Sequence, residues 1–490
     1  MMLLEGVMNV LSPSNLLFAF IGCLSGTLVG VLPGLGPVTA VAMLFPLTTY
    51  LPHDGMIIAL AAIYYGAMYG GSTTAILMNI PGEVASVPTA MDGFALTKQG
   101  KAGVALATAA IVSFLAGIFG TLVLSVVGPT LAKWCLNFGP VEYLALAIFS
   151  LTAIASLSGD SIVKGLIMAC LGMMMGAVGI DGLTGVARFS FGNSTLMNGF
   201  DIAPVMIGLF GLAEIFRGME EGSVGVYQGK IGKLMPNRQE LKTGLAAGTR
   251  ATVLATVLGV LPGMMVSIVT FIAYSFEKRF SKTPEKFGKG ALEGVAAAEA
   301  ANNAAAMASF IPLFALGIPT SGTMALILAA MMVFGVIPGP TMFTEHALFT
   351  WTIIGSFLVA NVILLILNLP LVRLWAKLAA VPFHIMSPII LAVCVAGAYS
   401  GRSSLFDVWV CLAFGVIGWL MSKHDWPSAP MVLGFILGDL LETAVRQVDA
   451  MGWASLKNRP IFFFFIGLAV LSMLVSHKVR KAGGNPISEA

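Results

Sequence analysis

One carboxylate stands inside a long apolar run near the middle of the chain. Residues 296–328 read AAAEAANNAAAMASFIPLFALGIPTSGTMALIL, and Glu299 precedes two amides, Asn302 and Asn303. Glu299 and Asn303 are four residues apart, so a helix would place them on one face. A carboxylate inside a membrane is costly and usually functional. We therefore expect these side chains to bind Na⁺, or Glu299 to carry a proton. The alternatives are an interfacial position or a lysine partner for Glu299.

The same run is interrupted by a group of small and polar residues, Pro319-Thr320-Ser321-Gly322-Thr323. A proline ends one helix and suits the first turn of the next. The free N–H groups at the start of that second helix carry partial positive charge and bind anions, and nearby hydroxyls add donors. The pattern predicts an anion site at a helix broken within the membrane, with a simple kink as the alternative.

A second break of the same kind occurs earlier in the chain. Residues 79–86 read NIPGEVAS, and they follow the stretch Gly70-Gly71-Ser72-Thr73-Thr74. Gly82 allows backbone dihedrals that other residues avoid, and Ser86 and Thr89 supply hydroxyl donors. If the two helix ends face each other in the middle of the membrane, they would hold a molecule with carboxylates at both ends.

These breaks belong to an internal repeat. GVLPGLG at 30–36 matches GVLPGMM at 259–265 with an offset of 229, and NIPGEVAS resembles GIPTSGTM at 317–324 with an offset of 238. The matches occur in the same order with similar spacing, which predicts two homologous halves, as in many secondary transporters. About seven apolar runs separate the two GVLPG sites, and an odd number of crossings would invert the second copy.

Composition places these elements in a membrane. The chain has 490 residues, of which 58% are hydrophobic and 10% charged, whereas a soluble protein carries about 25% charged residues. We therefore expect an all-α polytopic membrane protein with ten to twelve crossings. The 56 glycines and 24 prolines favour close helix packing and broken or re-entrant helices, which lipid tolerates only where protein or water covers the backbone.

Lysine-rich connections give the orientation. The stretch 217–245 and the basic tail at 477–481 are expected in the cytoplasm by the positive-inside rule. The stretch 277–289 is also rich in lysine, yet it cannot lie inside too if the run 246–275 crosses only once. The alternative is that this run, with Pro262-Gly263 at its centre, enters and leaves by one face.

Several function classes find no support in the sequence. It contains no Gly-x-Ser-x-Gly, HExxH or phosphate-loop motif, so we expect neither an enzyme nor catalytic residues. The five cysteines show no metal-ligand spacing or disulfide framework, and we expect no cofactor. The net charge of +3 gives no indication of nucleic-acid binding. Residues 1–6 lack a basic residue, so we expect the first span to stay attached.

Five stretches of the chain match motifs of one known family. They are Gly30 to Pro37, YGAMYGGSTTAILMNIPGEVASVPTAMDGFALTKQGKAGVALATA at 65–109, Asn302-Asn303 with Gly317 to Gly322, Leu433 to Glu442, and Arg459-Pro460. In these stretches the chain resembles the large transmembrane subunit of the tripartite tricarboxylate transporter family (TctA type). Thr320 stands where the family commonly has Gly, which leaves the substrate open, and Asp439 stands where an apolar residue is usual.

The resemblance implies a permease in a bacterial inner membrane that works with a small four-helix membrane subunit and a periplasmic solute-binding protein. It implies ion-driven import of small organic anions such as citrate, and an elevator-like design with two repeats. We expect a Na⁺ or H⁺ symporter for di- or tricarboxylates. The alternatives are a stand-alone carboxylate carrier without a binding protein and, less favoured, a channel or membrane scaffold.

The residue assignments follow from these patterns. We expect residues 1–216 to hold the first repeat and following helices, 217–245 a polar cytoplasmic loop, 246–380 the second repeat, and 381–490 C-terminal membrane helices and a short tail. Substrate binding is assigned to Gly34, Gly36, Ser72, Thr73, Asn79, Pro81, Gly82, Ser86, Pro319, Thr320, Ser321, Gly322 and Thr323. Binding of the coupling ion, with Na⁺ as the one metal considered, is assigned to Glu299, Asn302, Asn303 and Gly263.

Overall fold

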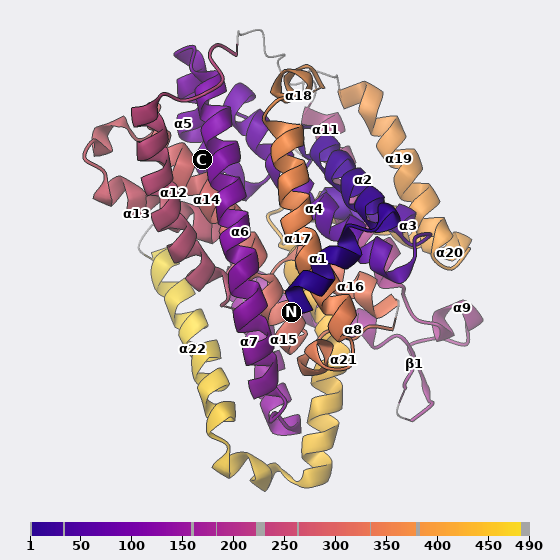
Figure 1. The fold of residues 1–490 in the computed structure, drawn as a ribbon. Coiled ribbons are helices and arrows are strands. Elements are labelled where there is room, and N and C mark those ends of the chain that lie inside the picture. Colours follow the sequence, from indigo (N-terminus) through magenta and orange to yellow (C-terminus); the bar gives the residue numbers. More distant parts are fainter. Residues whose placement is uncertain are drawn as a thin grey trace.

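The computed structural model describes residues 2–32, 35–157, 161–182, 184–221, 231–261, 264–333, 335–378 and 383–481. These residues are predominantly helical (Figure 1). The strands within the described ranges are β1 (Gly179–Ile180) and β2 (Ala187–Arg188), which pair antiparallel with Gly179 opposite Arg188. The expected all-helical class is therefore confirmed apart from one short hairpin.

Seven of the described helical segments are long and apolar enough to cross a membrane: Pro13–Gly30, His53–Met78, Ala102–Cys135, Ile202–Glu220, Ala347–Asn368, Leu405–Lys423 and Ser428–Met451. Six shorter apolar helical segments accompany them: Pro37–Thr48, Pro140–Ala153, Ile162–Gly176, Gly322–Val333, Ser387–Ser400 and Pro460–Leu474. Large apolar side chains such as Val126, Val257 and Phe464 are exposed on the outside of the bundle, as lipid-facing positions would be. These features describe a multi-pass membrane protein.

The N-terminal group of helices is α1 (Met2–Val10), α2 (Pro13–Gly30), α3 (Pro37–Thr48), α4 (His53–Met78), the 3₁₀ turn η1 (Val84–Ser86), α5 (Val87–Lys98) and α6 (Ala102–Cys135). Small residues let α2 and α4 pack closely: a methyl group added to Gly26 would lie 2.3 Å from the Ile63 carbonyl oxygen, and one added to Gly30 would lie 2.2 Å from that of Ala67. Such close backbone contact is the usual way that membrane helices associate.

A second group of helices follows later in the chain. It consists of α12 (Arg238–Gly259), α13 (Val266–Phe280), the 3₁₀ turn η3 (Pro284–Lys286), α14 (Leu292–Ala308), α15 (Phe310–Leu316), α16 (Gly322–Val333), the 3₁₀ turn η4 (Pro340–Phe343) and α17 (Ala347–Asn368). Helix α12 packs on α14 as α2 packs on α4. A methyl group on Gly259 would lie 2.9 Å from the Cα of Ala305, which mirrors the contact of Gly30 with Ala67.

Helices α12 and α13 form a hairpin whose two ends open on one face. Gln239 and Lys242 near the start of α12 line the same cleft as Ser281 and Lys282 just after α13. Lys242 and Lys282, one from each lysine-rich stretch, therefore lie on one side of the molecule. This is the arrangement expected if the run 246–275 enters and leaves by the same face.

The remaining elements surround these two groups. They are α7 (Pro140–Leu157), α8 (Ile162–Gly176), α9 (Ser194–Met197), α10 (Ile202–Met206), the π-helical turn η2 (Ile207–Leu212), α11 (Ala213–Glu221), α18 (Val372–Leu378), α19 (Phe383–Ser400), α20 (Leu405–Lys423), α21 (Ser428–Met451), η5 (Trp453–Asn458) and α22 (Pro460–Lys481). Figure 1 shows α21 and α22 joined by η5 at the lower end and α12 and α13 along the left edge.

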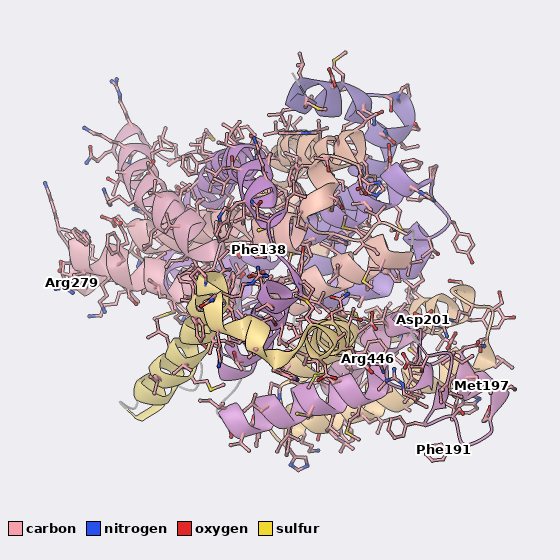
Figure 2. All side chains as sticks on the ribbon, turned by 90° about the horizontal axis from the view of Figure 1, so that it is seen from below. Phe138, Phe191, Met197, Asp201, Arg279 and Arg446 are labelled. Atoms are coloured by element: carbon pink, nitrogen blue, oxygen red, sulfur yellow. The ribbon has the colours of Figure 1, made fainter. Side chains whose placement is uncertain are left out.

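A small lobe carries the hairpin β1–β2 and α9. In Figure 2 Phe191 and Met197 lie at its outer edge, and Phe191 is 89% exposed. Arg446 of α21 ties the lobe to the bundle through a 2.9 Å ion pair with Asp181, and Arg188 of β2 pairs with Glu442 of α21 at 2.6 Å. The lobe is thus an anchored projection of the helical bundle.

Candidate functional site

Both expected helix breaks are present, and they have the same local geometry. Helix α4 ends at Asn79 (φ 60°) and α15 ends at Gly317 (φ 71°), and both residues are left-handed caps. The Ile80 N–H donates to the Thr74 carbonyl oxygen at 3.5 Å, and the Ile318 N–H donates to that of Pro312 at 3.3 Å. Bonds of this kind satisfy the free carbonyls of a helix end. The elements are therefore interrupted, not merely kinked.

The first break packs tightly against two other glycines. A methyl group on Gly82 would lie 3.0 Å from the Cα of Gly71, in the last third of α4. A methyl group on Gly36, the N-cap of α3, would lie 3.0 Å from the carbonyl oxygen of Gly82. Gly82 is thus required by close backbone approach. Pro81 precedes it in the same non-helical segment.

The carboxylate of Glu299 lies in the interior of the protein, with 1% of the residue exposed. Ser72 Oγ of α4 donates to one oxygen at 2.6 Å, and Thr89 Oγ1 of α5 donates to the other at 2.6 Å. Ser113 Oγ of α6 lies 3.5 Å away. No lysine of the described ranges lies within salt-bridge distance of Glu299. Neither the interfacial position nor the lysine pair matches this geometry.

A cavity of about 20 Å³ lies beside Glu299. Its polar walls are Tyr69, Ser72, Thr73, Glu299 and Asn368. The Asn368 side chain donates to the Leu364 carbonyl oxygen at 2.9 Å, while its own Oδ1 is buried without a hydrogen-bond partner. A space of this size holds about one water molecule. The carboxylate is therefore next to room for a single small occupant.

The two amides after Glu299 are buried and only half satisfied. Asn302 Nδ2 donates to Glu83 Oε1 at 3.4 Å, and Asn303 Nδ2 donates to the Glu299 carbonyl oxygen at 3.1 Å. The Oδ1 atoms of both amides have no hydrogen-bond partner. Buried oxygens without partners are uncommon, because each costs about 1–3 kcal/mol. Each of these oxygens is therefore an acceptor that a cation could use.

Two hydroxyls at the breaks are also unpartnered. Ser86 Oγ at the end of η1 and Thr320 Oγ1 before α16 are buried and have no hydrogen-bond partner. Ser321 Oγ accepts from the Met324 N–H at 3.3 Å, which caps α16 and still leaves its own proton to donate. Hydroxyl donors and free helix N–H groups therefore occur at both breaks.

The first turn of α3 contacts both breaks. Gly36 touches Gly82 as described, and a methyl group on Gly322 would lie 3.7 Å from Val38 Cγ1. The packing also runs the other way between the two groups. Helix α3 of the first group packs on α16, and helix α13 of the second group packs on η1. Both breaks thus contact the start of α3.

Other assigned residues are placed as follows. Thr73 and Thr323 are buried, and Pro319 lies in the non-helical segment before α16. Gly34 and Gly263 lie outside the described residues. Asp439 lines a separate cavity of about 250 Å³ with Arg188 and Glu442. Within the described part of the chain there is no group of three or more His, Cys, Asp or Glu that could hold a metal.

Sequence reasoning did not assign several polar residues of this region. Tyr65 and Tyr69 donate to Asn361 Oδ1 at 3.1 Å and 3.2 Å, and Asn361 Nδ2 donates to the Phe114 carbonyl oxygen at 2.7 Å. Asn368 and Glu83 were also missed as partners. Their signal was an isolated polar residue in an apolar or break segment, which alone does not identify a partner in another helix.

Asp92 of α5 joins the two helix groups. It is fully buried and accepts from the backbone N–H groups of Gly290 at 2.9 Å and Ala291 at 2.8 Å. Tyr274 of α13 donates its hydroxyl to the same carboxylate at 2.8 Å. Asp92, on a helix of the first group, therefore accepts hydrogen bonds from free N–H groups at the start of α14 in the second group.

Comparison with known proteins agrees with this architecture. Residues 16–433 match the model of the tripartite tricarboxylate transporter TctA family. An uncharacterized 52.8 kDa protein in the TAR-I ttuC' 3' region of Agrobacterium vitis is 45% identical over 446 residues, covering 90% of this chain and 88% of its own. An uncharacterized protein in the TAR-II ttuC' 3' region of the same organism is 41% identical over 210 residues, covering 42% and 87%. No solved structure matches the chain significantly. The chain belongs to the tripartite tricarboxylate transporter TctA family.

Proposed function

We propose that the protein is the permease subunit of a binding-protein-dependent secondary transporter that imports small di- or tricarboxylates, with citrate as the representative substrate. Family membership supports a subunit of a tricarboxylate transporter. The observation that carries the finer proposal is the set of buried polar atoms without partners at the two breaks and the helix between them. The donors without partners suit an anionic substrate, and the acceptors without partners suit a coupling cation.

The donor atoms suit the substrate. Ser86 Oγ and Thr320 Oγ1 can each donate a hydrogen bond to a carboxylate. The first N–H groups of α16 add a partial positive charge beside Thr320. A molecule with two or more carboxylates would engage one break with each end. Ser321 and the glycines at 36, 82 and 322 would shape the space around it.

The acceptor atoms suit the coupling ion. Asn302 Oδ1 and Asn303 Oδ1 are unpartnered, and a Na⁺ ion prefers such oxygens. Glu299 offers the alternative of proton coupling. Ser72 has one hydroxyl proton and two acceptors in reach, Met68 O at 3.2 Å and Glu299 Oε2 at 2.6 Å, so the bond network accommodates either protonation state of the carboxylate.

We also propose that the two helix groups are inverted structural repeats that move as an elevator-like carrier. Equivalent caps at Asn79 and Gly317, equivalent glycine contacts at Gly30 and Gly259, and the reciprocal packing of α3 and α13 support this. The protein would lie in a bacterial inner membrane, with a small membrane subunit and a periplasmic binding protein as its partners.

Transport by reconstituted protein tests the proposal. Proteoliposomes with the chain and its small membrane subunit should take up radiolabelled citrate, succinate or malate only with purified binding protein and an imposed Na⁺ or pH gradient. Uptake that is independent of the binding protein would favour the stand-alone carrier. Uptake that follows the carboxylate gradient alone would favour a channel, and the absence of carboxylate transport under every gradient would refute the proposal.

A further inference from the structure

A large polar cleft lies at the face where the lysine-rich stretches meet. Its volume is about 860 Å³, and it is formed by the end of α5, the start of α6, the start of α12, the end of α13 and the start of α14. The sequence predicts these lysines only as orientation signals. The structure gathers them around a concavity.

The cleft has an excess of positive charge that its own carboxylates do not neutralise. Arg250 makes a two-point contact with Glu277 at 3.0 and 2.5 Å, and Lys101 pairs with Glu240 at 3.3 Å. The remaining basic lining residues are Lys242, Lys282, Lys286 and Lys289, and within the described ranges none of them has a carboxylate within 4 Å. Glu293 is the remaining acidic lining residue. Four ammonium groups therefore face one unpaired carboxylate.

A positively charged cleft attracts anions over a distance, before they contact the protein. Like charges on the walls of a concavity focus the field and raise the local concentration of an oppositely charged solute, by about 10- to 1,000-fold in association rate in favourable cases. An isolated surface lysine has little such effect, because water and salt screen it. The concave arrangement distinguishes these lysines from an ordinary solvated face.

The cleft also leads toward Glu299. Helix α14 begins at Leu292 in the cleft wall, and Glu299 follows seven residues later, which is about 10 Å along a helix. Val104 of α6 lines the cleft, and Leu106, two residues further along the same helix, lines the small cavity beside Glu299. The charged cleft and the buried carboxylate thus lie about two helical turns apart along α14.

We propose that this cleft is a second, weaker binding site for polyvalent organic anions, through which the transported carboxylate passes between the break site and the aqueous phase on that face. The inference rests on the proposed function for the identity of the anion. Lys282 and Lys286 would bind its carboxylates together with Lys242 and Lys289. Small di- and tricarboxylates fit the spread of four amines better than monovalent anions.

Sided transport tests the proposal. The double variant Lys282→Gln/Lys286→Gln is compared with Lys278→Gln/Arg279→Gln, because both remove two charges near the end of α13. Lys278 and Arg279 do not line the cleft, and Figure 2 shows Arg279 at the outer edge of the molecule. Proteoliposomes with phosphatidylcholine as the only lipid hold the chain and its small membrane subunit under an imposed Na⁺ or pH gradient. Citrate is supplied either to the cleft face or, with purified binding protein, to the opposite face.

The cleft variant should raise KM for citrate from the cleft face about fivefold with kcat unchanged, and should weaken the dependence of KM on salt. KM from the opposite face should not change, and the control variant should behave as the parent on both faces. Equal KM values for both variants would overturn the proposal. An effect that appears only when phosphatidylglycerol is added would instead assign the cleft to lipid headgroups and would also overturn it.

A binding measurement separates this inference from the proposed function. In a cysteine-free background, maleimide labelling of Ser281→Cys in the cleft should slow several-fold in millimolar citrate, while labelling of Lys278→Cys should not. This readout requires no transport. If citrate slows labelling of Ser281→Cys but no transport occurs, the anion site is supported and the proposed function is refuted. If transport occurs but citrate does not slow labelling, the proposed function is supported and the anion site is refuted.

Discussion

Asn79 and Gly317 end their helices in the same left-handed conformation, 238 residues apart in the sequence. Asn is one of the few residues besides Gly that enters this conformation readily. The two positions differ in their surroundings, since a methyl group on Gly317 would lie 2.5 Å from the Pro338 carbonyl oxygen. The same turn is therefore built from different residues for a local steric reason.

This difference predicts unequal responses to substitution. Gly317→Ala should lower the free energy of unfolding by about 1–3 kcal/mol, because it combines a positive φ with a contact too short for a methyl group. Asn79→Gly should change stability by less than about 1 kcal/mol. Thermal unfolding in detergent, followed by tryptophan fluorescence, measures both. Equal stability of Gly317→Ala and the parent would contradict the assigned geometry.

Removing the unpartnered hydroxyls should affect transport without affecting stability. Ser86→Ala and Thr320→Val delete buried hydroxyls that bond to nothing in the structure, so the fold loses no hydrogen bond. If those hydroxyls donate to the substrate, each variant should raise KM for carboxylate uptake about tenfold, since a bond to a charged group is worth about 1.5 kcal/mol.

Thr108→Val is the matched control for the hydroxyl variants. Thr108 Oγ1 is also buried and unpartnered, but Thr108 lies on α6, where its Cγ2 is the atom nearest to a methyl group added at Gly244 of α12. Its loss should leave KM unchanged. If all three variants and the double variant Ser86→Ala/Thr320→Val transport like the parent, the substrate does not bind at the breaks.

Replacing the buried carboxylate should change the ion dependence. Glu299→Gln keeps the shape and can accept the hydrogen bonds of Ser72 or Thr89 through one oxygen only. We expect gradient-driven uptake to fall by about tenfold or more, equivalent to about 1.4 kcal/mol, with an altered Na⁺ or pH profile. The exposed Glu285→Gln serves as control. Identical Na⁺ and pH profiles for Glu299→Gln and the parent would exclude a coupling role.

Close packing of α2 on α4 gives a prediction about stability alone. Gly26→Ala places a methyl group 2.3 Å from the Ile63 carbonyl oxygen, so the helices must separate, at a cost of about 1–3 kcal/mol. Gly467→Ala on α22 meets nothing within 4 Å and should be neutral or slightly stabilising. Comparing the melting temperatures of the two variants checks this expectation.

The shared face of the lysine-rich stretches is testable by labelling. In a cysteine-free background, Lys242→Cys and Lys282→Cys should both react with a membrane-impermeant maleimide from the cytoplasmic side. Trp453→Cys in η5 should react from the other side, because α21 and α22 carry η5 to the far end of the bundle (Figure 1). Opposite labelling of positions 242 and 282 would refute the hairpin formed by α12 and α13.

Much of the architecture could be predicted from sequence because its signals are local. Proline, glycine and small polar residues at 79–86 and 317–322 correctly indicated the two helix breaks. Composition indicated the membrane bundle. The strands at 179–188 were missed, because a two-residue ladder in a polar loop has no periodicity to detect.

Partners between distant helices could not be predicted. Glu299 stood out as a lone carboxylate, yet nothing in the sequence places Thr89 and Ser72 on its two oxygens. Ser72 is assigned to the substrate by the sequence, and in the structure its hydroxyl lies within hydrogen-bonding distance of Glu299 Oε2 and of the Met68 carbonyl oxygen. The cleft could not be predicted either, because its lining residues come from helices that are far apart in the sequence.

The bonds of Asp92 bear on how this protein divides into working parts. A helix from the first half holds the start of a helix from the second half through two amides and a phenol. Sliding α5 past α14 would leave a buried anion and two amides without partners, at a cost of several kcal/mol. We therefore expect α5 and α14 to stay together in any movement of the protein, so that a boundary between moving parts would not separate the first half of the chain from the second.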